Sequence, residues 1–175
     1  MHIAAANNGA LSLKALSRFE EARSLLRKKM PVAQRVRGES DALTLSMRSN
    51  YARALCYDPT ATLGDLSEAV TTLEEIEQIA RRVLGESHDL TLRMRWIYAG
   101  ALYLDPGATL DDLRETVTTL EEIERIARRV LGGAHPLTSA FERHLRRARD
   151  TLAASEGDDV SSVCDMVAAM TPGDA

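Results

Sequence analysis

The chain has few of the residues that interrupt helices or cross-link small domains. Its 175 residues include 5 prolines and 2 cysteines, and aromatic residues make up only 4% of the composition. Cys56 and Cys164 lie far apart and outside any C-x-x-C spacing, so the sequence predicts neither a disulfide framework nor a zinc site. We therefore expect an all-helical protein without strands, in the reducing environment of the cytoplasm.

Long apolar runs and blocks of one charge are also missing. No run approaches the roughly 18 apolar residues of a membrane span, and the first residues lack the pattern of a secretion signal. The formal net charge is -4, with both signs mixed along the chain and no basic patch of the kind that binds nucleic acid. We predict no contact with membranes or nucleic acid and no cofactor.

The clearest feature present is an internal repeat. The segment that begins at Val36 recurs from Val83, 47 positions later, without a gap. A third copy opens at Val130 with the same offset and loses similarity after Thr138, and a shorter copy precedes the first. Self-similarity at a fixed period of this length is typical of stacked helical or strand repeats.

Each copy has the pattern of a helix pair. Apolar residues recur at helical spacing in two segments, which a turn containing Asp58 and Pro59 separates. Thr62 and Thr109 stand three positions before an aspartate, which predicts a capping box at the start of the second helix. A glycine follows each second helix, where a left-handed residue commonly ends a helix: Gly38, Gly85 and Gly132.

The order of several short motifs resembles a known family. VLGESH and VLGGAHP stand before a first helix, NNGA and SNYA lie within one, and RFEEA opens a second helix. Kinesin light chains and related tetratricopeptide repeat proteins share this order, and the resemblance covers roughly residues 1–150. It implies a right-handed α-α superhelix of about three helix pairs plus a C-terminal capping helix.

The resemblance also implies the domain limits. We expect a repeat domain over residues 1–154, with repeats at approximately 1–36, 37–83 and 84–130, a capping helix at 134–154 and a flexible tail at 155–175. Paired asparagines of the family occur here as Asn7 and Asn8, survive once as Asn50, and are replaced by Trp96 and Ile97 in the third repeat. The segment that would join a kinesin heavy chain is lacking, so we expect a divergent relative with a partner of its own.

Stacked helix pairs form a solenoid whose concave wall is built from the first helix of each pair. The family's pattern places the peptide-binding residues on this wall, and the sequence predicts a non-enzymatic adaptor that binds a protein or peptide there as a monomer. The alternatives are a self-associating scaffold and a fragment of a longer repeat array. The predicted binding residues are Asn7, Asn8, Lys14, Ser49, Asn50, Arg53, Arg93, Trp96, Ile97 and Tyr103.

These side chains have different expected roles. The asparagines can hold a peptide backbone, because an amide both donates and accepts hydrogen bonds. Trp96 and Tyr103 can hold an apolar anchor, and the arginines can pair with acidic groups, although a large aromatic residue on such a helix more often packs into the core. His88 and His135 recur at the same offset, and their place at helix starts explains them better than a metal site does. We find no catalytic motif and predict no enzymatic activity.

Overall fold

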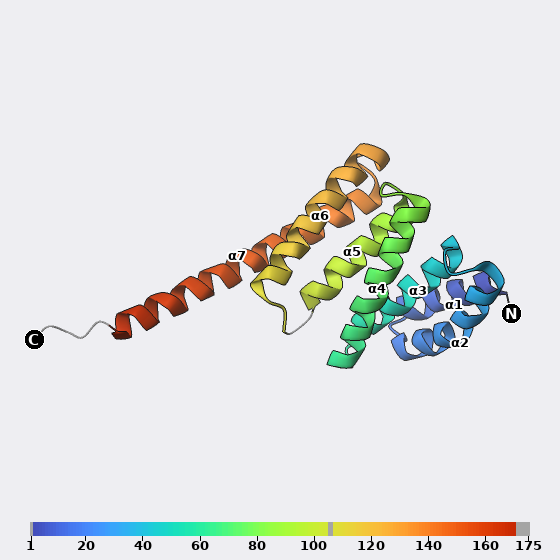
Figure 1. Cartoon of the computed structure of the whole chain (residues 1–175), viewed down its shortest axis with the longest axis horizontal. Coiled ribbons are helices and arrows are strands. Elements are labelled where there is room, and N and C mark those ends of the chain that lie inside the picture. The colour runs from blue at the N-terminus through green and yellow to red at the C-terminus, as the bar shows by residue number, and fades with distance from the viewer. Residues whose placement is uncertain (1, 105–106, 171–175) are drawn as a thin grey trace, which may run out of the picture.

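The computed structural model describes the backbone of residues 2–104 and 107–170, and the side chains of residues 2–103 and 107–157. These parts of the chain contain seven helices and no strand, which confirms the predicted all-α class (Figure 1). In chain order the helices are α1 (Ile3–Ala15), α2 (Phe19–Arg37), α3 (Ala42–Cys56), α4 (Leu63–Leu84), α5 (Asp89–Leu104), α6 (Leu110–Leu131) and α7 (Pro136–Met170).

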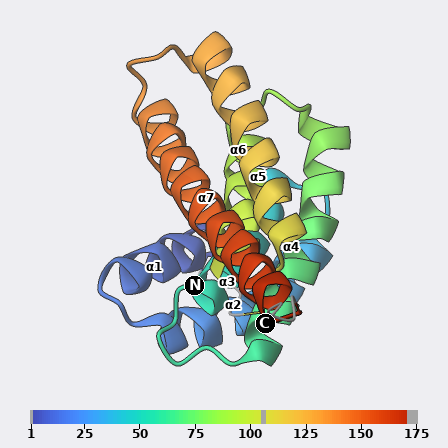
Figure 2. The same cartoon turned by 90° about the vertical axis from the view of Figure 1, so that its left-hand side faces the viewer.

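Consecutive helices pack against each other along the chain and form the predicted helix pairs α1–α2, α3–α4 and α5–α6. The first helices also contact one another, α1 with α3 and α3 with α5, and make the inner wall of the solenoid. The outer helices α2 and α4 contact these inner helices and lie behind them, and α6 packs between α5 and α7 (Figures 1 and 2). The predicted superhelix of helix pairs is thereby confirmed.

The predicted helix boundaries are built as expected. Thr62 accepts the backbone N–H of Asp65 while the Asp65 carboxylate accepts the N–H of Thr62, and Thr109 and Asp112 repeat this capping box. Glycines follow α2, α4 and α6 with φ of 90°, 91° and 89° and ψ near 160°. Only glycine adopts this region without strain, although a Cβ there would meet no other atom within 4 Å. The glycines are therefore required by backbone conformation and not by crowding.

Two clusters of buried apolar residues form the core. The first cluster extends through the five helices α1 to α5. The second lies between α5, α6 and α7, where Phe141 and Ile123 are fully buried. Small side chains at equivalent positions of the outer helices, Ala33, Ala80 and Ala127, are also fully buried and allow close helix contact. Trp96 of α5 packs against both clusters and joins them.

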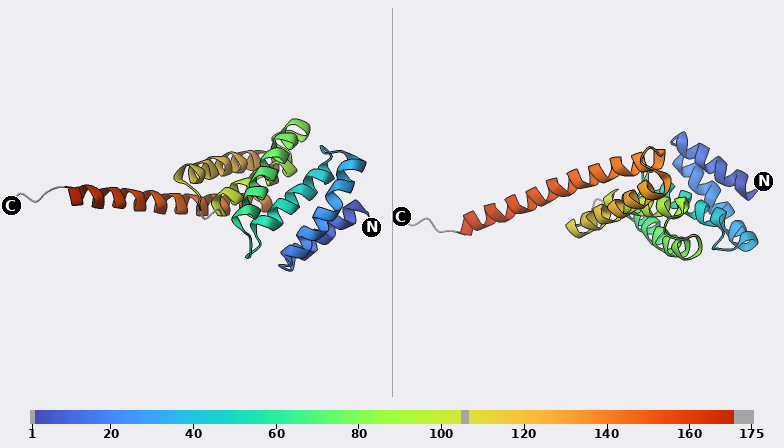
Figure 3. Two further views of the ribbon diagram at one scale, coloured as in Figure 1. Left: turned by 60° about the horizontal axis from the view of Figure 1, so that its bottom comes forward. Right: turned by 90° about the horizontal axis from the view of Figure 1, so that it is seen from above.

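The last helix is longer than the sequence predicted. We expected a capping helix over 134–154 and a flexible tail from 155, whereas α7 continues as a helix to Met170. Glu156 of α7 pairs with Arg114 near the start of α6 at 3.0 Å, and beyond this point α7 extends away from the other helices (Figures 1 and 3). No proline occurs between Pro136 and Pro172, so nothing in the backbone forces an earlier end. Residues 171–175 of the predicted tail lie outside the described residues.

Within the part of the chain that the structure describes, no helix is both long enough and apolar enough to cross a lipid bilayer.

Candidate functional site

A cavity of about 540 Å³ lies on the inner wall, between α1, α3, α5 and the start of α7. We call it the inner groove. It brings together six of the ten predicted binding residues: Ser49, Asn50, Arg53, Arg93, Trp96 and Ile97. Its other lining residues are Leu11, Ser46, His88, Asp89, Leu90 and Leu137.

A chain of polar side chains closes the α1 side of the inner groove. Lys14 Nζ donates a hydrogen bond to Asn50 Oδ1 at 3.4 Å, and Asn50 Nδ2 donates to Asn7 Oδ1 at 2.9 Å. Asn7 is only 6% exposed, so its amide is held in the contact between α1 and α3. Asn8 is exposed and does not line the groove. The three predicted asparagines therefore have different positions. Asn50 lines the groove, Asn7 accepts a hydrogen bond from Asn50 and does not line it, and Asn8 is exposed.

Arg53 lines the inner groove, and its guanidinium lies near two aromatic rings. Its guanidinium carbon is 5.7 Å from the centroid of the Tyr57 ring and 5.4 Å from that of Trp96, within the range of cation–π attraction. No ion pair of Arg53 or of Lys14 occurs among the described residues. Burial, together with the positive charge of Arg53, lowers the pKa of Lys14 to about 8. This wall of the groove thus holds positive charge that no carboxylate compensates.

The far end of the inner groove is electrically different. Arg93 lies 3.5 Å from the carboxylate of Asp89, one turn earlier on α5. His88 Nδ1 accepts the backbone N–H of Leu90 at 3.1 Å and so caps the start of α5, as His135 caps the start of α7 through Leu137. The histidines have the helix-start position that the sequence indicated. Among the described residues no group of three or more His, Cys, Asp or Glu side chains could hold a metal ion.

Trp96 combines the two roles that the sequence left open. Its ring meets Phe141 edge-on at 5.6 Å and His144 at 5.0 Å, both on α7. The indole therefore packs the contact between α5 and α7 while one part of it lines the inner groove. Its Nε1–H is buried and has no hydrogen-bond acceptor among the described residues.

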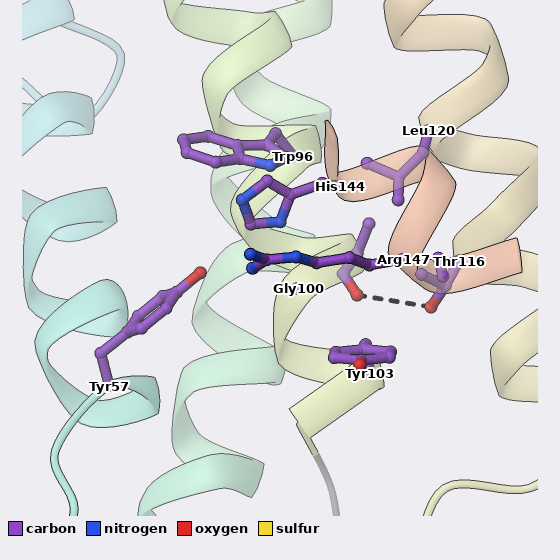
Figure 4. A pocket seen from close by; sticks show the side chains of 10 residues that line it. Tyr57, Trp96, Gly100, Tyr103, Thr116, Leu120, His144 and Arg147 are labelled. Atoms are coloured by element: carbon purple, nitrogen blue, oxygen red, sulfur yellow. Dashed lines mark hydrogen bonds between the residues drawn. The ribbon is translucent and has the colours of Figure 1, made fainter. Parts of the chain in front are cut away.

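A second, smaller cavity of about 160 Å³ lies on the other side of Trp96, between α5, α6 and α7. We call it the Trp96 pocket. Tyr103 is found here and not in the inner groove, with its hydroxyl 3.3 Å from Thr151 Oγ1 of α7. Figure 4 shows Trp96, His144 and Arg147 side by side, with Tyr57 facing them across the opening and Tyr103 at one end. The remaining lining residues are Ala99, Gly100, Thr116, Leu120 and Ala148.

Sequence reasoning missed the residues that α7 contributes. His144 and Arg147 line the Trp96 pocket, yet repeat similarity fades after Thr138 and α7 was expected to be only a polar cap. The offset of 47 positions nevertheless continues, and it aligns Arg147 with Gly100 and Arg53. Extending the repeat register by position would therefore have placed Arg147 on the inner wall.

Comparison with known proteins agrees with this architecture. Residues 2–41 match a family model described as tetratricopeptide repeat. A solved structure of nearly identical TPR-like repeats, from a Podosopora anserina protein described as a kinesin light chain, matches 99% of this chain and 80% of its own. Its TM-score is 0.72 at 20% sequence identity. A single-substitution form of the same Podosopora anserina repeats matches 97% of this chain and 96% of its own, with a TM-score of 0.51 at 19% identity.

No curated protein sequence matches the chain. The family match at the first repeat and the structural matches over almost the whole length confirm both the predicted tetratricopeptide-type solenoid and the resemblance to kinesin light chain repeats. Folds of this kind generally mediate protein–protein interaction or scaffolding and are typically not enzymes.

Proposed function

We propose that this tetratricopeptide-type solenoid is an interaction module that binds an acidic peptide segment in the inner groove. The observation that carries the proposal is the positive charge of Arg53 on one wall of that groove and of Lys14 beside it, bonded to the lining residue Asn50, with no ion pair of either cation among the described residues. The chain as a whole is negative, with a net charge of -4, so this charge is local to the groove and not a property of the entire surface.

A carboxylate is the group that best fits this wall. It would form charge-assisted hydrogen bonds with Arg53 and Lys14, which are shorter and stronger than bonds between neutral groups. It would also raise the pKa of Lys14 toward its ordinary value, because a nearby negative charge favours the charged amine. Binding and protonation of Lys14 are therefore expected to support each other.

Polar side chains next to Arg53 could form hydrogen bonds with an extended peptide backbone. Ser46, Asn50 and Arg53 recur three to four positions apart, so they lie along one face of α3. Asn50 Oδ1 accepts one hydrogen bond, from Lys14, and an amide oxygen can accept a second. Across the groove, Trp96 and Ile97 offer apolar surface for a neighbouring side chain.

We propose binding and not catalysis for this groove. Asp89 is the one carboxylate among the described residues that line it, and Asp89 lies 3.5 Å from Arg93, while His88 Nδ1 accepts the backbone N–H of Leu90. An acid–base pair would need a second titratable group free to reach a substrate, together with a site shielded from water.

A screen of fluorescent peptides that vary only in their acidic residues tests the proposal. Acidic peptides should bind, and Arg53→Gln should weaken their binding about tenfold, because it removes one charge-assisted contact. Arg125→Gln on the exposed side of α6 is the matched control and should leave the affinity unchanged. Binding that survives both Arg53→Gln and Lys14→Gln would place the ligand outside the inner groove and overturn the proposal.

The monomeric state and the cytoplasmic location stay predictions from the sequence, as does self-association into a scaffold. Light scattering over a concentration series separates the monomer from the scaffold. A constant mass at all concentrations would exclude self-association.

A further inference from the structure

Gly100 lines the Trp96 pocket and adds no side chain to it. Gly100 occupies in α5 the place that Arg53 occupies in α3, 47 positions earlier. A Cβ at Gly100 would lie 3.5 Å from the Tyr57 hydroxyl oxygen, which is an ordinary contact. Packing alone therefore tolerates alanine, which is also more favourable than glycine inside a helix. The glycine leaves a hollow open that a side chain would reduce or fill.

The hollow has the size of one ring. Its volume is about 160 Å³, and an apolar cavity of about 150 Å³ holds a benzene molecule. Apolar side chains and aromatic rings make most of its wall, among them Trp96, Tyr103 and Leu120. A phenyl ring, or a branched alkyl group of similar volume, matches this space.

The opening of the pocket is positively charged. Arg147 lines it, and no hydrogen bond or ion pair of Arg147 occurs among the described residues. Burial lowers the pKa of His144, and the positive charges of Arg147, Arg143 and Arg53 lower it further. No carboxylate is among the described residues that line the pocket. Arg147 thus lines this pocket without a counter-ion among the described residues.

We propose that the Trp96 pocket binds a small carboxylate whose single ring fills the cavity and whose carboxylate pairs with Arg147. 3-Phenylpropanoate has this form, and a C-terminal phenylalanine of a peptide presents the same ring and carboxylate. The pocket lies across Trp96 from the inner groove, so the proposal does not depend on peptide binding in that groove. Because Trp96 borders both cavities, a ligand in the pocket contacts the same indole that lines the groove.

Trp96 is the only tryptophan of the chain, so its fluorescence reports directly on the pocket. We would titrate the full chain with 3-phenylpropanoate and excite the indole alone, expecting a dissociation constant on the order of 0.1–1 mM for a ligand of this size. Arg147→Gln should weaken binding about tenfold, through loss of one charge-assisted contact. Gly100→Leu should abolish binding, because the new side chain fills the cavity. Arg125→Gln, on the exposed side of α6, should leave the affinity unchanged.

Three results would overturn the proposal: no binding to the natural sequence, full binding to the Gly100→Leu variant, or equal binding of the neutral 3-phenylpropanamide. Circular dichroism checks that each variant folds. If Gly100→Leu does not fold, Gly100→Ala replaces it and should weaken binding, and equal affinity of Arg147→Gln and the natural sequence would still refute the pairing.

A second titration identifies the source of the ligand. Tighter binding of acetyl-Ala-Ala-Phe than of 3-phenylpropanoate would support the proposal with a peptide C-terminus as the source, and weaker binding would support it with a free small carboxylate. The natural sequence could bind acidic peptides in an Arg53-dependent way and yet not bind 3-phenylpropanoate. That result would overturn the proposal for the Trp96 pocket and leave the proposal for the inner groove intact.

Discussion

The two ends of the inner wall are held together by different chemistry. Between α1 and α3 the contact is a hydrogen-bonded series from Lys14 through Asn50 to Asn7. Between α5 and α7 it is aromatic, with Trp96 against Phe141 and His144. Polar contacts of the first kind fix geometry and contribute modest net stability, whereas burial of large rings contributes most of the stability and little direction. The inner wall therefore has a polar, directional half at α1–α3 and an aromatic half at α5–α7, and buried apolar clusters accompany both.

The largest expected effect comes from removing the aromatic contact. Trp96→Ala should lower the free energy of unfolding by about 3 kcal/mol, the lower end of the range for deleting a large buried ring, because Trp96 is only partly buried. Urea unfolding followed by circular dichroism measures it, since the fluorescent residue is lost. Leu16→Ala is the control, because Leu16 is 67% exposed and should contribute little. A loss no greater than that of the control would show that the aromatic half does not depend on Trp96.

Breaking the polar contact should cost less. Asn50→Ala leaves the buried amide oxygen of Asn7 without its donor, and the expected loss in unfolding free energy is about 1–3 kcal/mol. Asn8→Ala on the same helix as Asn7 is the matched control, because Asn8 is exposed and should tolerate alanine. Equal stability of the two variants would mean that the hydrogen bond between Asn50 and Asn7 contributes nothing measurable.

The smallest expected effect is a pH dependence of stability that comes from Lys14, in the polar half of the inner wall. Its folded pKa of about 8 lies below its ordinary value of 10.5, so the unfolded chain binds more protons between these values and stability rises with pH across this window. Because part of the side chain is exposed, we expect a gain of about 1 kcal/mol. Unfolding at pH 7 to 10 should show this rise for the natural sequence and for Lys28→Met, and not for Lys14→Met. A rise that persists in Lys14→Met would have to come from another group.

Much of the fold could be predicted because the repeat determines it. The offset of 47 positions, the threonine caps and the glycines after each second helix each have a local cause, and the structure realises all of them. The position of Asn50, Arg53 and Trp96 beside the inner groove also follows, since helical spacing decides which face of α3 and α5 turns inward.

The remaining features of the candidate site depend on which helix packs over each face of another helix. Helical spacing treats Asn7 and Asn50 alike, and only the approach of α1 to α3 decides that Asn7 is buried. Tyr103 and Arg147 line the same pocket because side chains of α7 pack against those of α5 and α6. Gly100 borders a cavity only because these helices surround it. Such features arise from several distant segments at once, so no single stretch of sequence carries their signal.

The double contact of Trp96 has a consequence for how the molecule melts. Repeat arrays behave as one-dimensional chains in which each unit is coupled to its neighbours, and weak coupling lets segments unfold separately. Here one indole belongs to the packing of both core clusters and stands at their junction. We therefore expect Trp96 to couple the two clusters, so that its removal makes the unfolding transition less cooperative as well as less favourable to the folded state.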